Sequence, residues 1–376
     1  MEPDAGAAPA ASEAEKKDLF TFIQDSVQEQ LETPAAADAE LIFVGTKNSG
    51  KSTMVQAFLQ KEEQPKPSTP LEYRYARRSV GANSTVVANV WELGGGVTST
   101  SQLDNLLKVV LLPELLSRSV VAIVLDMSEP ETAVTTLQMW LEKLRARVDS
   151  MRQDLAATSA GAKIAAAARK AIEETWKDHP DFSVSAVETV QPVGIPIVVL
   201  AHKYDAFEQA YTEGEHRKTL CRTLRFLSHQ AGASLICTRH KEKQSMTLLR
   251  NMLYHHVFHT SAIDGRLLQL EHSRPLVVAA SADSFGGIGK PPTVQGCLSD
   301  VTADKWRAVF EEYFPPPKES RDQAQDLTMV EAEQFAEESI DQMSRQKREE
   351  LIKMRKAAEF EAKMQDAAAA ATTAGP

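Results

Sequence analysis

Residues 45–52 read Gly45-Thr46-Lys47-Asn48-Ser49-Gly50-Lys51-Ser52, which is a complete G-x-x-x-x-G-K-[ST] phosphate-loop pattern. The apolar run at residues 41–44 precedes this stretch, and residues 53–59 follow it with helical spacing. A strand, a glycine-containing loop and a helix in this order attract an anion, because the backbone N–H groups of the loop and the helix N-terminus point toward it. The stretch therefore predicts a nucleotide-binding type of fold.

The pattern also assigns roles to individual side chains. Lys51 would reach the β- and γ-phosphates of a nucleotide, and the Ser52 hydroxyl would bind Mg²⁺. The predicted nucleotide-binding residues are Gly45, Asn48, Ser49, Gly50, Lys51, Ser52, Thr53, Gly95, Lys203 and Asp205, and the predicted metal-binding residues are Ser52 and Thr69. The expected cofactor is GDP or GTP with Mg²⁺, and an empty site stays open as the alternative.

Three further motifs of Ras-like GTPases have counterparts downstream. Thr69 lies in a proline-rich loop after Lys51, where a switch threonine would close over Mg²⁺. Residues 92–95 read Glu-Leu-Gly-Gly and match D-x-x-G with Glu in place of Asp. Residues 202–205 read His-Lys-Tyr-Asp and match N-K-x-D with His in place of Asn. The Asp205 carboxylate would accept hydrogen bonds from guanine N1 and N2, so the constellation favours a guanine nucleotide.

The departures from these motifs concern catalysis. Gly96 stands where a Ras-type enzyme has the glutamine that orients the attacking water. Glu92 is one methylene longer than the usual aspartate, and His202 does not reproduce the contacts of a carboxamide. The last guanine loop is at best residues 238–240, Thr-Arg-His. We therefore expect nucleotide hydrolysis to be slow or absent, and expect no enzymatic activity.

Short apolar runs that alternate with helical stretches predict the rest of the fold. Strands are expected at residues 41–44, 73–75, 86–91, 120–125, 195–200 and 234–237. Nearly continuous apolar strands separated by helices indicate a mainly parallel sheet that is covered on both faces. The prediction is an α/β Ras-like P-loop fold with a six-stranded sheet.

Four segments are expected along the chain. Residues 1–37 combine a disordered start with a short amphipathic helix, in which Ser12 and Glu15 have capping-box spacing and Leu19, Ile23, Val27 and Leu31 recur every four residues. Residues 38–262 form the P-loop domain, and residues 263–317 pack on it. Residues 318–376 form a charged helical extension with a low-complexity tail.

Residues 128–192 are too long for a minimal connection and predict a helical insertion. Its first part carries Leu137, Leu141 and Leu144, and its second part is rich in alanine. We favour a helical pair on the domain surface over a dedicated partner site.

Composition excludes several classes of protein. The chain has 376 residues, of which 43% are hydrophobic and 25% charged, with a net charge of −10. The acidic balance does not suggest a nucleic-acid partner. No apolar run reaches the roughly 18 residues of a membrane span, so we expect no membrane insertion. Three scattered cysteines and the absence of a secretory signal at the start favour a reducing, cytoplasmic compartment.

Several of these stretches resemble the dynein light intermediate chain family, in particular the type that belongs to cytoplasmic dynein 2. The resemblance covers about residues 38–315 and rests on residues 41–52, 72–78, 91–96, 203–205 and 283–289. Its most specific motif is Trp-Glu-Leu-Gly-Gly-Gly at residues 91–96, and the long Gly/Ser/Pro-rich tail of the dynein 1 type is missing.

The resemblance implies a non-catalytic subunit that binds the dynein 2 heavy-chain tail and the other dynein 2 subunits. It further implies work with the intraflagellar transport machinery in retrograde transport and cilium assembly. The implied locations are the cytoplasm, the cytoskeleton and the axoneme and basal body of the cilium or flagellum. The alternative from the motifs alone is a guanine-nucleotide-dependent switch with slow GTPase activity, and a P-loop kinase is a weaker third.

Overall fold

The computed structural model describes residues 38–61, 70–79, 85–94, 100–182, 190–239, 242–293, 301–317 and 346–347. The chain divides into two compact units, Met1–Pro316 and Pro317–Pro376. The amphipathic helix predicted before residue 38 lies outside the described residues. So do the tail and nearly all of the charged extension, of which only Gln346 and Lys347 are described, as helix.

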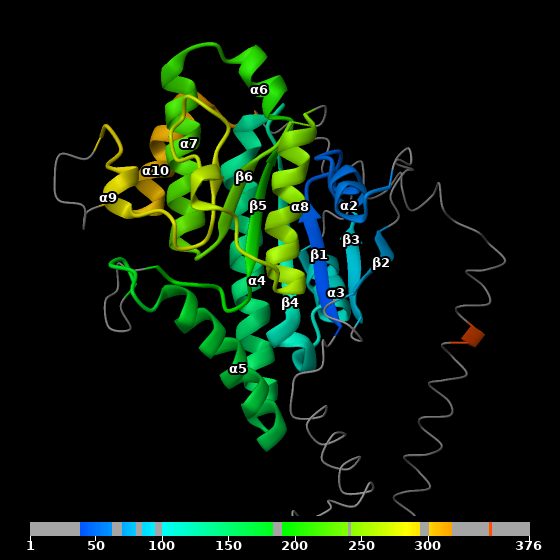
Figure 1. Cartoon of the computed structure of the whole chain (residues 1–376). Helices are drawn as coiled ribbons and strands as arrows, with labels where there is room; N and C mark the ends of the chain where they lie inside the picture. The colour runs from blue at the N-terminus through cyan, green and yellow to red at the C-terminus, as the bar shows by residue number, and fades with distance from the viewer. Residues whose placement is uncertain are drawn as a thin grey trace, which may run out of the picture. The chain divides into compact units, whose positions relative to one another are not determined.

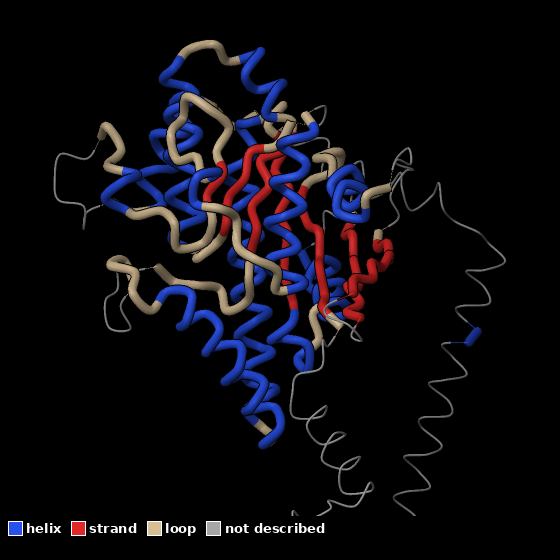
Figure 2. Tube along the Cα trace, viewed as in Figure 1, coloured by secondary structure: helices blue, strands red, loops and turns tan. Residues whose placement is uncertain are grey.

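The described part of the first unit is built on one twisted sheet with the strand order β2-β3-β1-β4-β5-β6-β7 (Figure 2). Strands β3, β1, β4, β5 and β6 are parallel, and β2 and β7 are antiparallel edge strands. The strands are β1 (Ala39–Gly45), β2 (Leu71–Ser79), β3 (Thr85–Leu93), β4 (Ser119–Asp126), β5 (Ile197–His202), β6 (Ser234–Cys237) and β7 (Val277–Val278).

The predicted α/β Ras-like P-loop fold is confirmed, and all six predicted strands are present. The predicted strand number is wrong by one among the described residues, because β7 adds a seventh strand. The stretch over residues 274–292 is predicted to begin with a strand outside the six-stranded sheet, and the structure instead pairs Val277 and Val278 with β6, so that this strand joins the sheet.

Helices cover both faces of the sheet (Figure 1). They are α2 (Lys51–Leu59), α3 (Thr100–Val110), α4 (Ala133–Ala156), α5 (Ser159–Trp176), α6 (Tyr204–Ala210), α7 (Gly214–Gln230), α8 (Lys243–Phe258), α9 (Phe285–Ile288) and α10 (Ala303–Tyr313). Short 3₁₀ helices are η1 (Pro113–Arg118), η2 (Pro130–Thr132) and η3 (Gly265–Leu267). None of the described helices is both long and apolar enough to span a bilayer.

The two faces of the central strands bury separate cores, which explains their continuous apolar runs. Leu41 and Phe43 of β1 pack with α2 and α8 on one face. Ile42 and Val44 point to the other face, where α3, α4 and α7 cover the sheet and α10 packs on α7.

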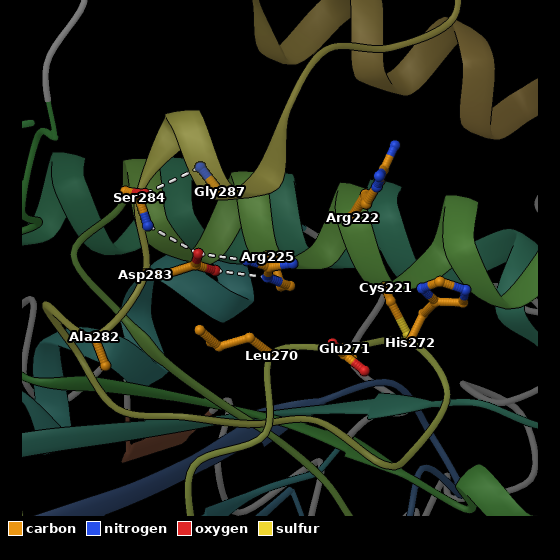
Figure 3. Close-up of a pocket in the computed structure, with 10 residues that line it drawn as sticks. All are labelled: Cys221, Arg222, Arg225, Leu270, Glu271, His272, Ala282, Asp283, Ser284 and Gly287. Carbon is orange, nitrogen blue, oxygen red and sulfur yellow. Dashed lines mark hydrogen bonds and ion pairs between the residues drawn. The ribbon is translucent and has the colours of Figure 1, made fainter. Parts of the chain in front are cut away.

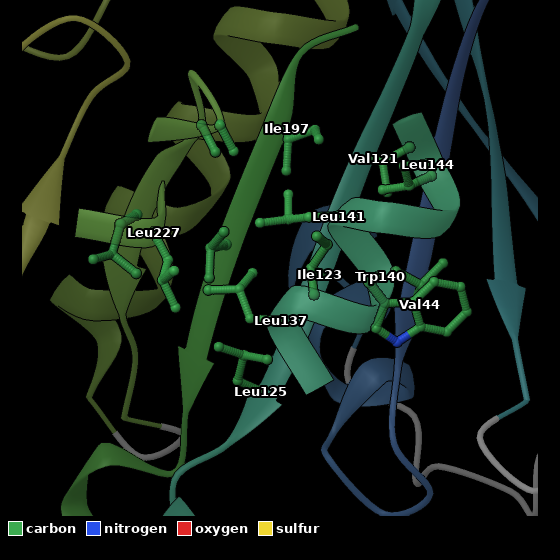
Figure 4. Close-up of a cluster of buried hydrophobic side chains, with 14 of the residues drawn as sticks. Val44, Val121, Ile123, Leu125, Leu137, Trp140, Leu141, Leu144, Ile197 and Leu227 are labelled. Carbon is green, nitrogen blue, oxygen red and sulfur yellow. The ribbon is translucent and has the colours of Figure 1, made fainter. Parts of the chain in front are cut away.

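The predicted surface pair at residues 128–192 is wrong for its first helix. Leu137, Leu141 and Leu144 of α4 are at most 4% exposed and lie against Val121, Ile123 and Ile197 of the sheet (Figure 4). Helix α4 is thus the crossover helix between β4 and β5, and its leucine spacing alone fits either environment.

Helix α5 is the added element. Its N-cap residue Thr158 accepts a hydrogen bond from the Gly161 N–H at 3.0 Å. It packs on α4 and η1 through Ala168 and Trp176, while most of its alanines are exposed.

A buried ion pair fastens the segment after α8 to the sheet domain (Figure 3). Arg225 on α7 donates two hydrogen bonds to the Asp283 carboxylate, at 2.7 and 2.5 Å, and both side chains are at most 8% exposed. Nearby, Asp181 accepts hydrogen bonds from the Phe285 N–H and from the His229 ring, at 2.8 and 3.0 Å. The chain thereby returns to α7 before α10 buries its aromatic face there.

Candidate functional site

The phosphate loop connects β1 to α2 at the carboxyl end of the parallel strands, which is where ligands bind in open α/β sheets. Two of its glycines are required by their surroundings. Gly45 has a φ of +149°, and a β-carbon there would lie 2.2 Å from the Val124 carbonyl oxygen of β4. Gly50 has a φ of +93°, and its β-carbon would lie 2.4 Å from Cδ2 of His202. The loop is therefore held tightly between β4 and the end of β5.

Ser49 supplies a direct sign that the loop suits an anion. Its Oγ is fully buried and has no hydrogen-bond partner within the described residues. Such a hydroxyl costs about 1–3 kcal/mol when it stays unsatisfied. A phosphate oxygen bound in the loop would satisfy it.

Lys51 turns its amine into the same loop. Its Nζ donates hydrogen bonds to the carbonyl oxygens of Gly45, at 3.3 Å, and Thr46, at 2.7 Å. The residue is 5% exposed, and burial lowers the pKa of the Lys51 amine although the Glu92 carboxylate opposes the shift. The buried hydroxyl, the two glycines and this amine fit a phosphate group.

Ser52 and Glu92 meet directly. The Ser52 hydroxyl donates a hydrogen bond of 2.6 Å to Oε1 of Glu92, which lies at the end of β3 and is 3% exposed. Glu92 is paired with Phe43 in the register of β3 with β1, which brings it to the strand end beside the phosphate loop. The sequence-predicted metal position at Ser52 is thus in contact with a carboxylate of the chain itself. The other predicted metal residue, Thr69, lies outside the described residues, as do Gly95 and Gly96.

His202 joins three loops at the position of the motif asparagine. Its ring lies against Gly50, and its Nδ1 is 3.0 Å from the Thr238 hydroxyl. The side chain is 3% exposed, so it acts as a buried packing group between the phosphate loop and the loop after β6.

Lys203 forms an ion pair with Asp126, a residue that the sequence did not indicate as part of the site. Its Nζ donates a hydrogen bond of 2.5 Å to Oδ2 of Asp126, the last residue of β4. Burial opposes ionisation of Asp126, but hydrogen bonds from Lys203 and Ser128 outweigh it and lower the pKa of that carboxyl. The available signal was an acidic residue directly after the predicted strand at residues 120–125.

Asp205 differs from its neighbours. It lies in the first turn of α6, is half-buried, and forms no hydrogen bond or ion pair within the described residues. Its carboxylate is free to accept from a guanine base. In the last predicted guanine loop, Arg239 is paired with Glu208 at 2.6 Å, and His240 lies outside the described residues.

The arrangement brings together most of the predicted site residues that the structure describes. His202 connects the phosphate loop to Lys203 and to Asp205 at the start of α6. The predicted residues that share this loop and the start of α2 are Gly45, Asn48, Ser49, Gly50, Lys51, Ser52 and Thr53. Chemically, the site offers a phosphate cradle and a carboxylate for a base. The polar side chains around the site are hydrogen-bonded to one another, as Ser52 is to Glu92 and Lys203 is to Asp126.

Comparison with known proteins gives consistent matches. The family model described as dynein light intermediate chain (DLIC) matches residues 14–263. The human cytoplasmic dynein 2 light intermediate chain 1 is 34% identical over 326 residues, covering 84% of this chain and 87% of the human protein. The human cytoplasmic dynein 1 light intermediate chain 1 is 26% identical, over 65% of this chain and 50% of its own length. A crystal structure of the dynein light intermediate chain's conserved domain aligns over 76% of this chain and 95% of its own, at 18% identity and a TM-score of 0.49.

Proposed function

The chain belongs to the dynein light intermediate chain family, and we propose that it serves as the light intermediate chain of a cytoplasmic dynein 2 complex. The observation that carries this proposal is the extent of the similarity, which runs well beyond the phosphate loop and covers most of both chains. In this role the chain binds the tail of the dynein 2 heavy chain and stabilises the complex.

The same role sets its wider context. A dynein 2 subunit acts with the intraflagellar transport machinery, in retrograde transport and cilium assembly. The chain then resides in the cytoplasm and at the axoneme and basal body, associated with the cytoskeleton.

The contacts of the loop support a scaffold without catalysis. Ser52 is hydrogen-bonded to Glu92, and Lys203 is held by Asp126. His202 fills the position from which an asparagine would contact the nucleotide site. These contacts are made between residues of the protein itself and stabilise the carboxyl end of the sheet. The stability of the fold therefore depends less on a bound nucleotide than that of a switch protein does.

A second candidate is a guanine-nucleotide-dependent switch, which two observations favour. The Ser49 hydroxyl has no partner within the described chain, and Asp205 presents an unengaged carboxylate. GDP or GTP would be held by the loop residues 45–53 and by Asp205, with Ser52 toward Mg²⁺. The nucleotide would supply phosphate charges that Lys51 and the helix N-terminus neutralise.

Affinity capture separates the two. The tagged full-length chain is purified from ciliated cells, and its partners are quantified by mass spectrometry against a tag-only control. We expect the dynein 2 heavy chain as the main partner, in equal amounts with added GDP or a non-hydrolysable GTP analogue. Recovery that depends on the nucleotide supports the switch, and recovery of no dynein 2 heavy chain overturns the proposed role.

A further inference from the structure

A groove of about 550 Å³ lies at the edge of the sheet opposite the phosphate loop. Its floor is formed by the starts of β4, β5 and β6, including Val120, Ile197 and Ser234. Its walls are one side of α5 and the last turns of α8. The groove falls within the size range of sites that bury ligands or side chains.

The lining of the groove suits an aliphatic occupant. Helix α5 contributes Ala168, Ala171 and Ile172, and the opposite wall contributes Met252 and Ile263. The small alanine side chains let another backbone approach α5 closely, and the longer aliphatic side chains across the groove offer contact area.

The N-terminal segment leaves the sheet beside this groove. Strand β1 begins at Ala39, and Glu40 pairs with Ser119 at the start of β4. Ser119 itself lines the groove together with Arg118. Figure 1 shows the starts of β1 and β4 at the same end of the sheet. Residue 38 is therefore next to the rim of the groove.

The preceding residues have the pattern of a helix that needs an apolar partner. Leu19, Ile23, Val27 and Leu31 fall on one side of a helix over residues 12–31, and Asp18, Asp25 and Glu29 fall on the other. The family model begins at residue 14, so most of this segment belongs to the domain that the family shares. The segment carries five acidic and two basic residues, and the charged side chains that line the groove are Arg118 and Glu174, beside His255, His256 and His259.

Residues 32–38 connect the N-terminal segment to β1 and are long enough for that segment to reach the groove. Residues 32–38 span up to about 24 Å when extended. The groove extends under three strands beyond β1, a distance of about 14 Å at ordinary strand spacing.

We propose that residues 12–31 form a helix that seats Leu19, Ile23, Val27 and Leu31 in this groove of the same chain. The N-terminal segment then occupies the groove between α5 and α8. Its acidic side faces solvent.

Cross-linking tests the proposed neighbourhood. Both full-length variants carry Cys297→Ser and Val27→Cys. The test variant adds Ala171→Cys, which lies in the groove, and the control variant adds Ala166→Cys, on the exposed far side of α5. The natural Cys221 and Cys237 are buried. With a short bis-maleimide at low protein concentration, we expect an intramolecular product at least tenfold more abundant with Ala171→Cys. Equal yields from both pairs overturn the proposal, and products that are only dimers assign the groove to a second copy.

Hydrogen exchange tests the contact without new cysteines. The variant Ile23→Asp/Val27→Asp places two charges on the apolar side, and Thr21→Asp/Gln28→Asp places the same charges off it. We expect amides of residues 168–176 and 252–259 to exchange at least tenfold faster in the first variant and at wild-type rates in the second. Unchanged exchange of β4 and β5 verifies folding. Equal rates at the groove in both variants and wild type contradict the proposal.

Discussion

The ring of His202 lies directly on the α-carbon of Gly50, so close that a β-carbon at position 50 would be 2.4 Å from Cδ2 of the imidazole. This contact joins the phosphate loop to the carboxyl end of β5. The histidine also reaches Thr238 at 3.0 Å, which brings the loop after β6 into the same cluster. His202, which departs from the GTPase motif, thus packs between the phosphate loop and the loop after β6 at the candidate nucleotide site.

Gly50→Ala should destabilise the protein by about 1–3 kcal/mol, because the new methyl group meets His202 and the backbone has a positive φ. Urea unfolding followed by circular dichroism measures the change. Gly214→Ala at the start of α7 is the matched control, since nothing lies within 4 Å of its β-carbon. A loss as small as that of the control would show that the loops are not packed as described.

Leu141→Ala tests the assignment of α4 to the core. Leu141 is only 4% exposed and packs against the sheet, so its truncation should lower the free energy of unfolding by about 2–5 kcal/mol. Leu112→Ala, at a position that is 42% exposed, serves as the control and should cost much less. Similar losses of unfolding free energy from the two substitutions would indicate that α4 lies on the surface and not in the core.

Asp283→Ala should destabilise the protein by about 3–5 kcal/mol, because it leaves the buried Arg225 guanidinium without its carboxylate. The exposed pair of Arg169 and Glu173 gives the comparison, and Glu173→Ala should stay within about 1 kcal/mol of wild type. Thermal unfolding of the three proteins checks the prediction. A small effect of Asp283→Ala would mean that the segment after α8 is not fastened through this ion pair.

The stability of the fold should fall in acid through His256. Burial, and then the charges of His255 and His259, lower the pKa of His256 from 6.5 to about 4. The unfolded chain therefore binds a proton at this residue at a higher pH than the folded chain does. The contribution of His256 to the free energy of unfolding is fully present above pH 6.5 and is lost as the pH falls toward 4. The free energy of unfolding falls by up to about 1.4 kcal/mol per pH unit in this range. His256→Gln should remove this part of the slope in unfolding experiments across that range, and an unchanged slope would contradict it.

The sequence predicted the parts of the fold that depend on local patterns. Strand β1, the phosphate loop and α2 follow from an apolar run, two glycines and helical spacing, and each lies where it was expected. The core position of α4 did not follow, because a leucine stripe has the same spacing whether it faces a sheet or another surface helix.

The site was predictable in its loops and not in its contacts. Motif spacing predicted Lys51, Ser52 and Asp205 as site residues, and each lies shortly after a strand end at the same edge of the sheet. The hydrogen bonds of Ser52 to Glu92 and of Lys203 to Asp126 join residues that are far apart in the chain. They depend on strand order and register, which a single sequence does not specify.

The central claim is that the chain is a dynein 2 subunit whose attachment to the heavy chain does not require a nucleotide. The most direct test captures full-length Lys51→Ala from ciliated cells beside wild type and Lys47→Ala, an exposed position of the same loop. Each sample is analysed for heavy chain per captured chain and for nucleotide released on denaturation. We expect equal heavy chain in all three, and any nucleotide found with wild type and Lys47→Ala to be lost from Lys51→Ala. Loss of the heavy chain from a folded Lys51→Ala protein, together with its nucleotide, would contradict the claim.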